Sequence, residues 1–155
     1  MIEPDDNADG SDQMEIRVES LELQSITASA DCAVLRITGE IDVYSASQVR
    51  EEVIKLLGNG TRHIIADLSG VDFLDSTGLG ALVGSLKRLR EQDGSLALVA
   101  SATKILTVFR VTGLIRVFEI HPSVSEAIGS EEHWQAALAQ QGQSSTEWCG
   151  GHGLQ

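Results

Sequence analysis

The chain has 155 residues, enough for one domain of ordinary size and little else. Hydrophobic residues make up 42% of the sequence and aromatic residues only 4%, which predicts a core of Leu, Ile, Val and Ala and excludes a wholly disordered chain. The net charge of −12 argues against unassisted binding to nucleic acid or to an anionic membrane.

The sequence also carries no targeting signal. No apolar run is long enough to cross a bilayer, and the acidic N-terminus lacks the basic start and apolar stretch of a secretory signal. We therefore expect a cytoplasmic protein. Cys32 and Cys149 should remain thiols in that reducing compartment, although a small redox regulator that uses both cysteines is one alternative function.

Both ends of the chain differ in composition from its middle. Residues 1–13 contain five acidic residues and no Lys or Arg, which predicts a disordered acidic tail. Residues 14–129 form the expected domain. Residues 130–155 are expected to be an extension, with a possible short helix over 131–139 and a disordered Gln-, Ser- and Gly-rich tail from about Gln140.

Between the tails, hydrophobic periodicity predicts strands that alternate with helices. The expected strands are 21–29, 32–38, 63–68, 96–100 and 115–120, and the expected helices are 46–57, 77–90, 103–112 and 122–128. The nearly continuous apolar run HIIADL at 63–68 is typical of a central strand covered on both faces. Ser45 and Gln48 have the spacing of a capping box at the start of the first helix.

This order predicts an α/β fold. Strands separated by helices form a parallel sheet, whereas the first two strands are joined by a tight turn and must be antiparallel. The expected architecture is therefore a single domain with a mixed, mostly parallel sheet of four to five strands, packed with about four helices and flanked by disordered tails.

The most informative segment is DFLDSTGLG at 72–80, which leaves a buried strand and enters a helix. Ser76 falls at or next to the N-cap, where Asp75 or Ser76 can accept hydrogen bonds from free amides of the helix. Gly78 and Gly80 have no side chains, so that another surface can approach the backbone of the first turn at these two positions. The plainer interpretation is a capped helix whose glycines, with Gly84, serve packing against the sheet.

Known catalytic and ligand-binding motifs do not fit this segment. A nucleophile elbow requires Gly two residues before the serine, where Leu74 stands, and no phosphate-binding Gly-Lys-Ser or Gly-Lys-Thr occurs. The four histidines are scattered, and Cys149 with His152 is only half a zinc site. We therefore expect no catalysis, no metal site and no cofactor.

The run FLDSTGLGALV at 73–83 resembles the signature of the STAS-domain anti-sigma factor antagonists of bacteria. The sequence GEID at 39–42 is similar to the Gly-Glu-Leu-Asp turn that follows the second strand in that family. The order of strands and helices also agrees with this family from about Leu21 to Gly129.

The resemblance implies that Ser76 is phosphorylated, with Thr77 as the next candidate. In that family an anti-sigma factor that is itself a serine kinase adds the phosphate, and a protein phosphatase removes it. The unphosphorylated antagonist binds the kinase and frees the sigma factor for transcription. The partner surface that the resemblance and the segment together suggest comprises the following residues: Asp42, Ser45, Asp75, Ser76, Thr77, Gly78 and Gly80. Asp42 alone would equally suit a turn.

A STAS domain with another role is the main alternative. Such a domain serves as an adaptor or subunit of a lipid or anion transport system, or as a scaffold piece in a stress-sensing complex. The sequence leaves open the oligomeric state, the identities of the sigma factor, kinase and phosphatase, and nucleotide binding.

Overall fold

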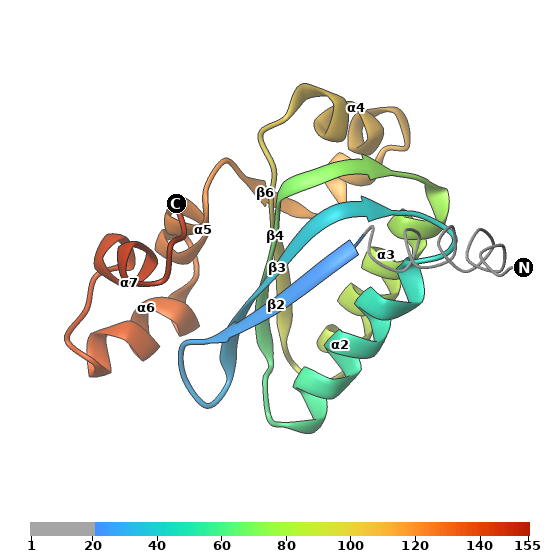
Figure 1. Cartoon of the computed structure of the whole chain (residues 1–155). Helices are drawn as coiled ribbons and strands as arrows, with labels where there is room; N and C mark the ends of the chain where they lie inside the picture. The colour runs from blue at the N-terminus through green and yellow to red at the C-terminus, as the bar shows by residue number, and fades with distance from the viewer. Residues whose placement is uncertain (1–20) are drawn as a thin grey trace, which may run out of the picture.

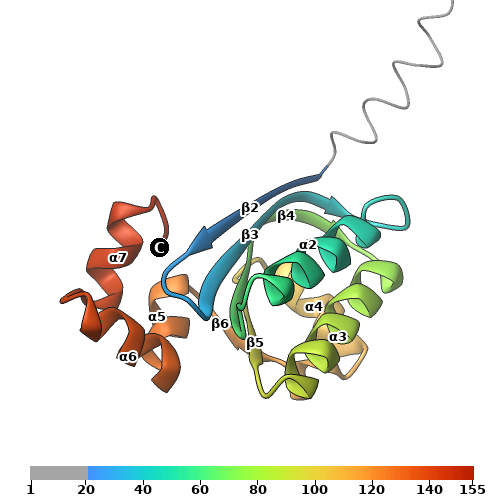
Figure 2. The same cartoon turned by 90° about the horizontal axis from the view of Figure 1, so that it is seen from below.

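The computed structural model describes residues 21–155, which form a central sheet with helices on both faces (Figures 1 and 2). The strand order in the sheet is β2-β3-β4-β5-β6. β2 pairs antiparallel with β3, and the remaining neighbours pair in parallel, so the predicted mixed α/β sheet is confirmed. The strands are β2 Leu21–Thr27, β3 Cys32–Ile41, β4 His63–Leu74, β5 Ser95–Val99 and β6 Glu119–His121.

The helices occupy the connections between strands and the C-terminal part of the chain. They are α2 Ala46–Gly58, α3 Ser76–Glu91, α4 Thr103–Val111, α5 Val124–Gly129, α6 Glu132–Gln140 and α7 Ser145–Gly151, with a short 3-10 helix at Leu114–Arg116. Figure 2 shows α2, α3 and α4 on one face of the sheet and α5, α6 and α7 on the other. The helix expected over 131–139 is present as α6.

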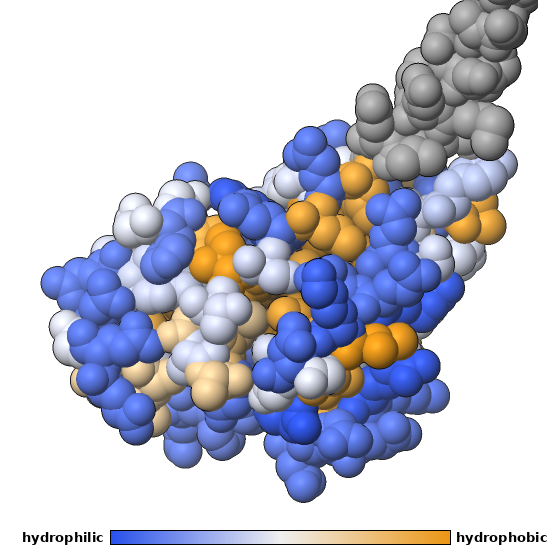
Figure 3. Space-filling model, turned by 60° about the horizontal axis from the view of Figure 1, so that its bottom comes forward, coloured by the Kyte–Doolittle hydropathy of each residue, from blue (hydrophilic) through white to orange (hydrophobic). Residues whose placement is uncertain are grey.

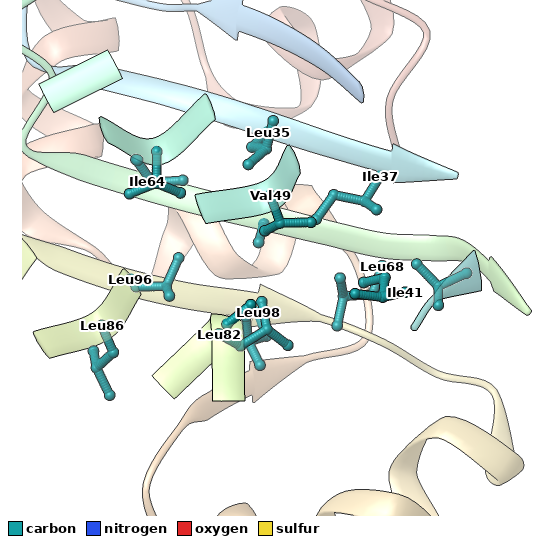
Figure 4. Close-up of a cluster of buried hydrophobic side chains, with 14 of the residues drawn as sticks. Leu35, Ile37, Ile41, Val49, Ile64, Leu68, Leu82, Leu86, Leu96 and Leu98 are labelled. Carbon is teal, nitrogen blue, oxygen red and sulfur yellow. The ribbon is translucent and has the colours of Figure 1, made fainter. Parts of the chain in front are cut away.

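The larger core lies between the sheet and α2, α3 and α4. Leu35 of β3, Ile64 of β4 and Leu98 of β5 meet Val49 of α2 and Leu82 of α3, and all five side chains are buried (Figure 4). The helices contribute them at three- and four-residue spacing and the strands at two-residue spacing. This core holds the starts of α2 and α3 against the carboxyl ends of the parallel strands.

A second core covers the opposite face of the sheet. Val34 of β3 and Ile65 of β4 pack in one buried cluster with Trp134 of α6 and with Trp148 and Cys149 of α7. The expectation of a disordered tail from about Gln140 is therefore wrong. Composition did not predict the helix because this segment has few apolar residues. Trp148, Cys149 and Leu154 are nevertheless enough to hold it, because each is buried in the cluster on the second face of the sheet.

Several expected boundaries also differ from the structure. The strand expected over 115–120 is wrong in its first half, which is the 3-10 helix Leu114–Arg116, and only β6 at Glu119–His121 is extended. β4 continues to Leu74 instead of ending near Leu68. Its last half mixes the polar Ser69 and Asp72 with buried Val71 and Leu74, and it pairs with the end of β3 up to Ile41.

Two expectations concern other parts of the chain. The acidic tail expected at residues 1–13, and residues 14–20 at the start of the expected domain, lie outside the described residues. Within residues 21–155, no helix combines the length and the apolar character that crossing a membrane requires.

Candidate functional site

The site is built on the first turn of α3. Asp75 is the N-cap residue, and its carboxylate accepts a hydrogen bond of 2.9 Å from the backbone amide of Gly78. Its carbonyl accepts from the amide of Leu79 at 2.9 Å, which is the first hydrogen bond of the helix. Of the two residues that the sequence offered as the N-cap, Asp75 is the one that caps α3, and the hydroxyl of Ser76 takes no part in capping.

Ser76 is the first residue of α3 and is exposed, and Thr77 behind it is partly exposed. Both hydroxyls therefore sit at the positive end of a four-turn helix, where a negative charge is stabilised. Because the helix is already capped by Asp75, a group added to Ser76 would not have to replace a hydrogen bond that holds the fold.

The second part of the site is the turn between β3 and α2. The carboxylate of Asp42 accepts hydrogen bonds from the backbone amides of Tyr44 and Ser45, at 2.9 and 3.1 Å. The hydroxyl of Ser45 contacts the carbonyl of Glu40 at 2.7 Å and accepts from the amide of Asp42 at 3.0 Å. Asp42 therefore shapes the turn, as one interpretation of the sequence held, and its carboxylate stays partly exposed.

Ser45 does not take the role expected of it. Its side chain is buried and bonded within the turn, so it has no free group to offer to a partner. The capping box predicted with Gln48 is also absent: Ser45 makes no side-chain capping bond to α2. Its hydroxyl already bonds to Glu40 on the strand side of the turn, and this bond competes with capping.

The two parts of the site are held together by the sheet. Ile41, the last residue of β3, pairs with Leu74, the last residue of β4, because the two strands are parallel. The backbone amide of Asp75 donates to the carbonyl of Ile41 at 3.3 Å. The turn at Asp42 and the start of α3 therefore lie next to each other at one edge of the sheet, as Figure 1 shows.

The glycines of the first turn differ in what they do. Gly78 is buried, and a Cβ placed on it would lie 2.7 Å from the carbonyl oxygen of Ile41 and 2.7 Å from Leu74 Cδ1. Gly78 therefore permits the close approach of α3 to β3 and is not part of an open surface. Gly80 is exposed, and a Cβ there would meet nothing within 4 Å; the same space surrounds Gly84. The expected packing role of Gly80 and Gly84 is wrong.

Exposed apolar side chains border the site, which sequence reasoning did not find. Val43 and Tyr44 in the turn after Asp42 are 63% and 59% exposed, and Phe73 at the end of β4 is 48% exposed. Figure 3 shows one face on which hydrophobic groups gather in small areas between hydrophilic ones. The sequence could have indicated the exposure of Val43 and Tyr44, because both apolar residues fall in a turn, outside any hydrophobic period.

The two cysteines lie away from this site and are buried. Burial raises the pKa of the Cys32 thiol to about 12 and that of the Cys149 thiol to about 11. Asp31 beside Cys32 and Asp67 near Cys149 act in the same direction. Since the thiolate is the reactive form, both residues behave as apolar core groups, and the structure gives no support to the redox alternative.

The histidines are less scattered in space than in the sequence. His63 at the start of β4 lies close to Glu131 and His133 at the start of α6, and these three can offer ligand atoms to one metal ion. Nearly seventy residues separate His63 from the other two, so no spacing in the sequence could have indicated the cluster. It lies at the opposite end of β4 from Ser76.

Comparison with known proteins finds a matching domain family and similar proteins. The STAS domain model matches residues 24–127. The anti-sigma-B factor antagonist of Staphylococcus aureus is 38% identical over 80 residues, which cover 52% of this chain and 74% of that protein.

Solved structures show the same fold. An anti-sigma factor antagonist from Mycobacterium paratuberculosis superposes with a TM-score of 0.65 at 23% identity, covering 72% of this chain and 93% of that one. The Bacillus cell fate determinant SpoIIAA in its phosphorylated form gives a TM-score of 0.56 at 24% identity, covering 70% and 97%. The match of the STAS domain model and the 38% identity to the Staphylococcus aureus antagonist show that the chain belongs to the STAS-domain family of anti-sigma factor antagonists.

Proposed function

We propose that this chain is an anti-sigma factor antagonist whose partner binding is switched by phosphorylation of Ser76. The observation that carries the proposal is the exposed Ser76 hydroxyl at the first position of α3, next to the Asp42 turn and the apolar Val43, Tyr44 and Phe73. In its unphosphorylated form the chain binds an anti-sigma factor serine kinase and releases the sigma factor. A phosphatase restores this form, and the chain itself performs no catalysis.

The surface around Ser76 has the properties of a protein interface. Exposed Val43, Tyr44 and Phe73 would provide the apolar contact area of an interface core. The carboxylates of Asp42 and Asp75 adjoin this area, so a phosphate on Ser76 would add to negative charge already present there. Thr77 is less exposed than Ser76, which makes it the second choice for modification.

Phosphorylation should act on the interface and leave the fold intact. A phosphate on Ser76 adds about −1.5 to −2 charges. At the start of α3 the helix dipole favours this charge by about 0.3–1 kcal/mol. In the complex, the same group adds bulk and repels acidic groups of the facing protein. A loss of about 2.7 kcal/mol would weaken binding about a hundredfold.

The experiment is a capture from host lysate with wild type, Ser76→Ala, Ser76→Asp and Ser101→Asp as bait, with the retained proteins identified by mass spectrometry. Ser101 is a matched control because it is also exposed between a parallel strand and the following helix. Wild type, Ser76→Ala and Ser101→Asp should retain a kinase-like anti-sigma factor that Ser76→Asp loses.

Two results would contradict the proposal. If all four baits retain the same transport or scaffold proteins, Ser76 is no switch and the adaptor function takes its place. A chain carrying phosphoserine at position 76 should also keep its circular dichroism spectrum and lose affinity; an altered spectrum with unchanged affinity would argue against an effect on the interface.

A further inference from the structure

One cluster of metal-ligating side chains lies outside the proposed switch. His63 is the first residue of β4, Glu131 is the N-cap residue of α6, and His133 lies in the first turn of α6. One ligand atom from each lies within 4.8 Å of the other two. We propose that His63, Glu131 and His133 bind one Zn²⁺ ion, which fastens the C-terminal helices to the sheet.

The two imidazoles lie against each other. Their ring centroids are 3.9 Å apart and the planes are inclined by 16°, so the rings stack, and the His133 ring must turn before both rings can direct a nitrogen lone pair at one ion. His63 is buried and fixed in place, whereas Glu131 is half-buried and His133 is exposed. The two residues from α6 can therefore adjust their side chains toward His63. Ligand atoms on a tetrahedral zinc lie roughly 3.4 Å apart, a small contraction of the present cluster.

A hydrogen bond outside the cluster orients His63. Its Nδ1 lies 2.9 Å from the hydroxyl oxygen of Ser95. When Nδ1–H donates to Ser95, Nε2 of His63 carries the lone pair for the metal. Zinc-bound histidines in proteins are held in this way, by a partner for the second ring nitrogen.

The ligand set favours Zn²⁺ over the hard cations. Two imidazole nitrogens and one carboxylate oxygen suit Zn²⁺, whereas Ca²⁺ and Mg²⁺ require mostly oxygen ligands. Three protein ligands leave the fourth tetrahedral position to water.

The position of the cluster gives zinc a structural role. His63 lies within the region matched by the STAS domain model, whereas Glu131 and His133 lie beyond residue 127. One ion would therefore join the sheet to the helices α6 and α7 that cover its second face. A ligand that binds only the folded state stabilises that state, so zinc should raise the melting temperature of the chain.

The test uses the full chain without an affinity tag, stripped of metal and titrated with Zn²⁺ against a chromophoric chelator. One Zn²⁺ should bind per chain and raise the melting temperature. His133→Gln and Glu131→Gln should each weaken binding by at least about tenfold. Because both residues are at least partly exposed, the metal-free variants should keep the wild-type circular dichroism spectrum.

The matched control is His152→Gln. His152 and Cys149 are close in the sequence and could also attract zinc, although neither belongs to the proposed site. His152→Gln should leave the zinc affinity unchanged. Co²⁺ in place of Zn²⁺ should give the intense visible absorption of a four-coordinate site in wild type and His152→Gln, but not in His133→Gln. Absence of stoichiometric binding, or binding that His133→Gln leaves intact, would overturn the proposal.

Discussion

Asp75 combines a structural contact with a charge at the surface. Its carboxylate caps α3 through the amide of Gly78, and the same carboxylate adjoins the proposed partner surface. A change at this position can therefore affect binding either through the helix or through the charge. Asn separates the two effects, because it caps a helix as well as Asp does but is neutral.

We predict that Asp75→Ala lowers the free energy of unfolding by about 1 kcal/mol, because the amide of Gly78 loses its acceptor. Asp75→Asn should leave stability within a few tenths of a kcal/mol of wild type, about the precision of such comparisons. Urea unfolding followed by circular dichroism measures both. If Asp75→Asn is as destabilising as Asp75→Ala, the carboxylate acts through its charge on the helix and not through the hydrogen bond.

Gly78 and Gly80 make a second test at the residue scale. Gly78→Ala would force a Cβ against the Ile41 carbonyl and Leu74, and should lower the free energy of unfolding by about 1–3 kcal/mol. Gly80→Ala adds a Cβ in open space within the same helix and should raise it by about 0.5–1 kcal/mol. Urea unfolding of both variants checks the pair, and equal effects would contradict the close approach of α3 to β3.

At the scale of elements, the start of α3 and the turn before α2 form one site because β3 and β4 are parallel. Parallel neighbours end at the same edge of the sheet, so connections that are distant in sequence become adjacent. The phosphorylation candidate Ser76 thus lies next to Asp42, Val43 and Tyr44 without any local signal that links them.

The helices α6 and α7 are elements of the fold and not an appendage. We predict that Trp148→Ala lowers the free energy of unfolding by about 3 kcal/mol or more, because Trp148 is buried against Trp134 and the second face of the sheet. Gln140→Ala, at an exposed position of α6, is the control and should be nearly neutral. Chemical unfolding measures both; a neutral Trp148→Ala would mean that α7 contributes nothing to stability.

At the scale of the molecule, the sheet has two hydrophobic cores, one on each face, and each cysteine is buried in the second. Because burial raises their thiol pKa values to about 12 and about 11, few thiolates form near neutral pH. Raised pKa values also mean that the folded state loses stability as pH rises through the ordinary thiol range toward these values.

We predict that both thiols resist a disulfide reagent in the native protein at mildly alkaline pH and react promptly in urea. Their modification should follow the unfolding of the molecule, because neither is exposed in the folded state. Absorbance of the released thiolate measures the rates. Fast reaction of either cysteine in the native chain would return the redox alternative to consideration.

The sequence by itself determined the fold class and singled out the DSTG segment. Alternating periodicity placed most of the elements, and HIIADL at 63–68 indicated a strand covered on both faces, which Ile64 and Ile65 confirm by packing in opposite cores. These features are local: a strand, a cap or a glycine-containing helix start depends on residues a few positions apart. The DSTG run could therefore be assigned without a structure.

Only the tertiary structure decided which distant residues meet. It buried Ser45 and Gly78, exposed Tyr44 and Phe73, ordered α7 and brought His63 to His133. Each outcome depends on what lies across the sheet or at its edge, and composition averages over such contacts. A segment rich in Gln, Ser and Gly can still dock through Trp148 and Leu154, because a few large side chains bury enough apolar area when a matching face is available.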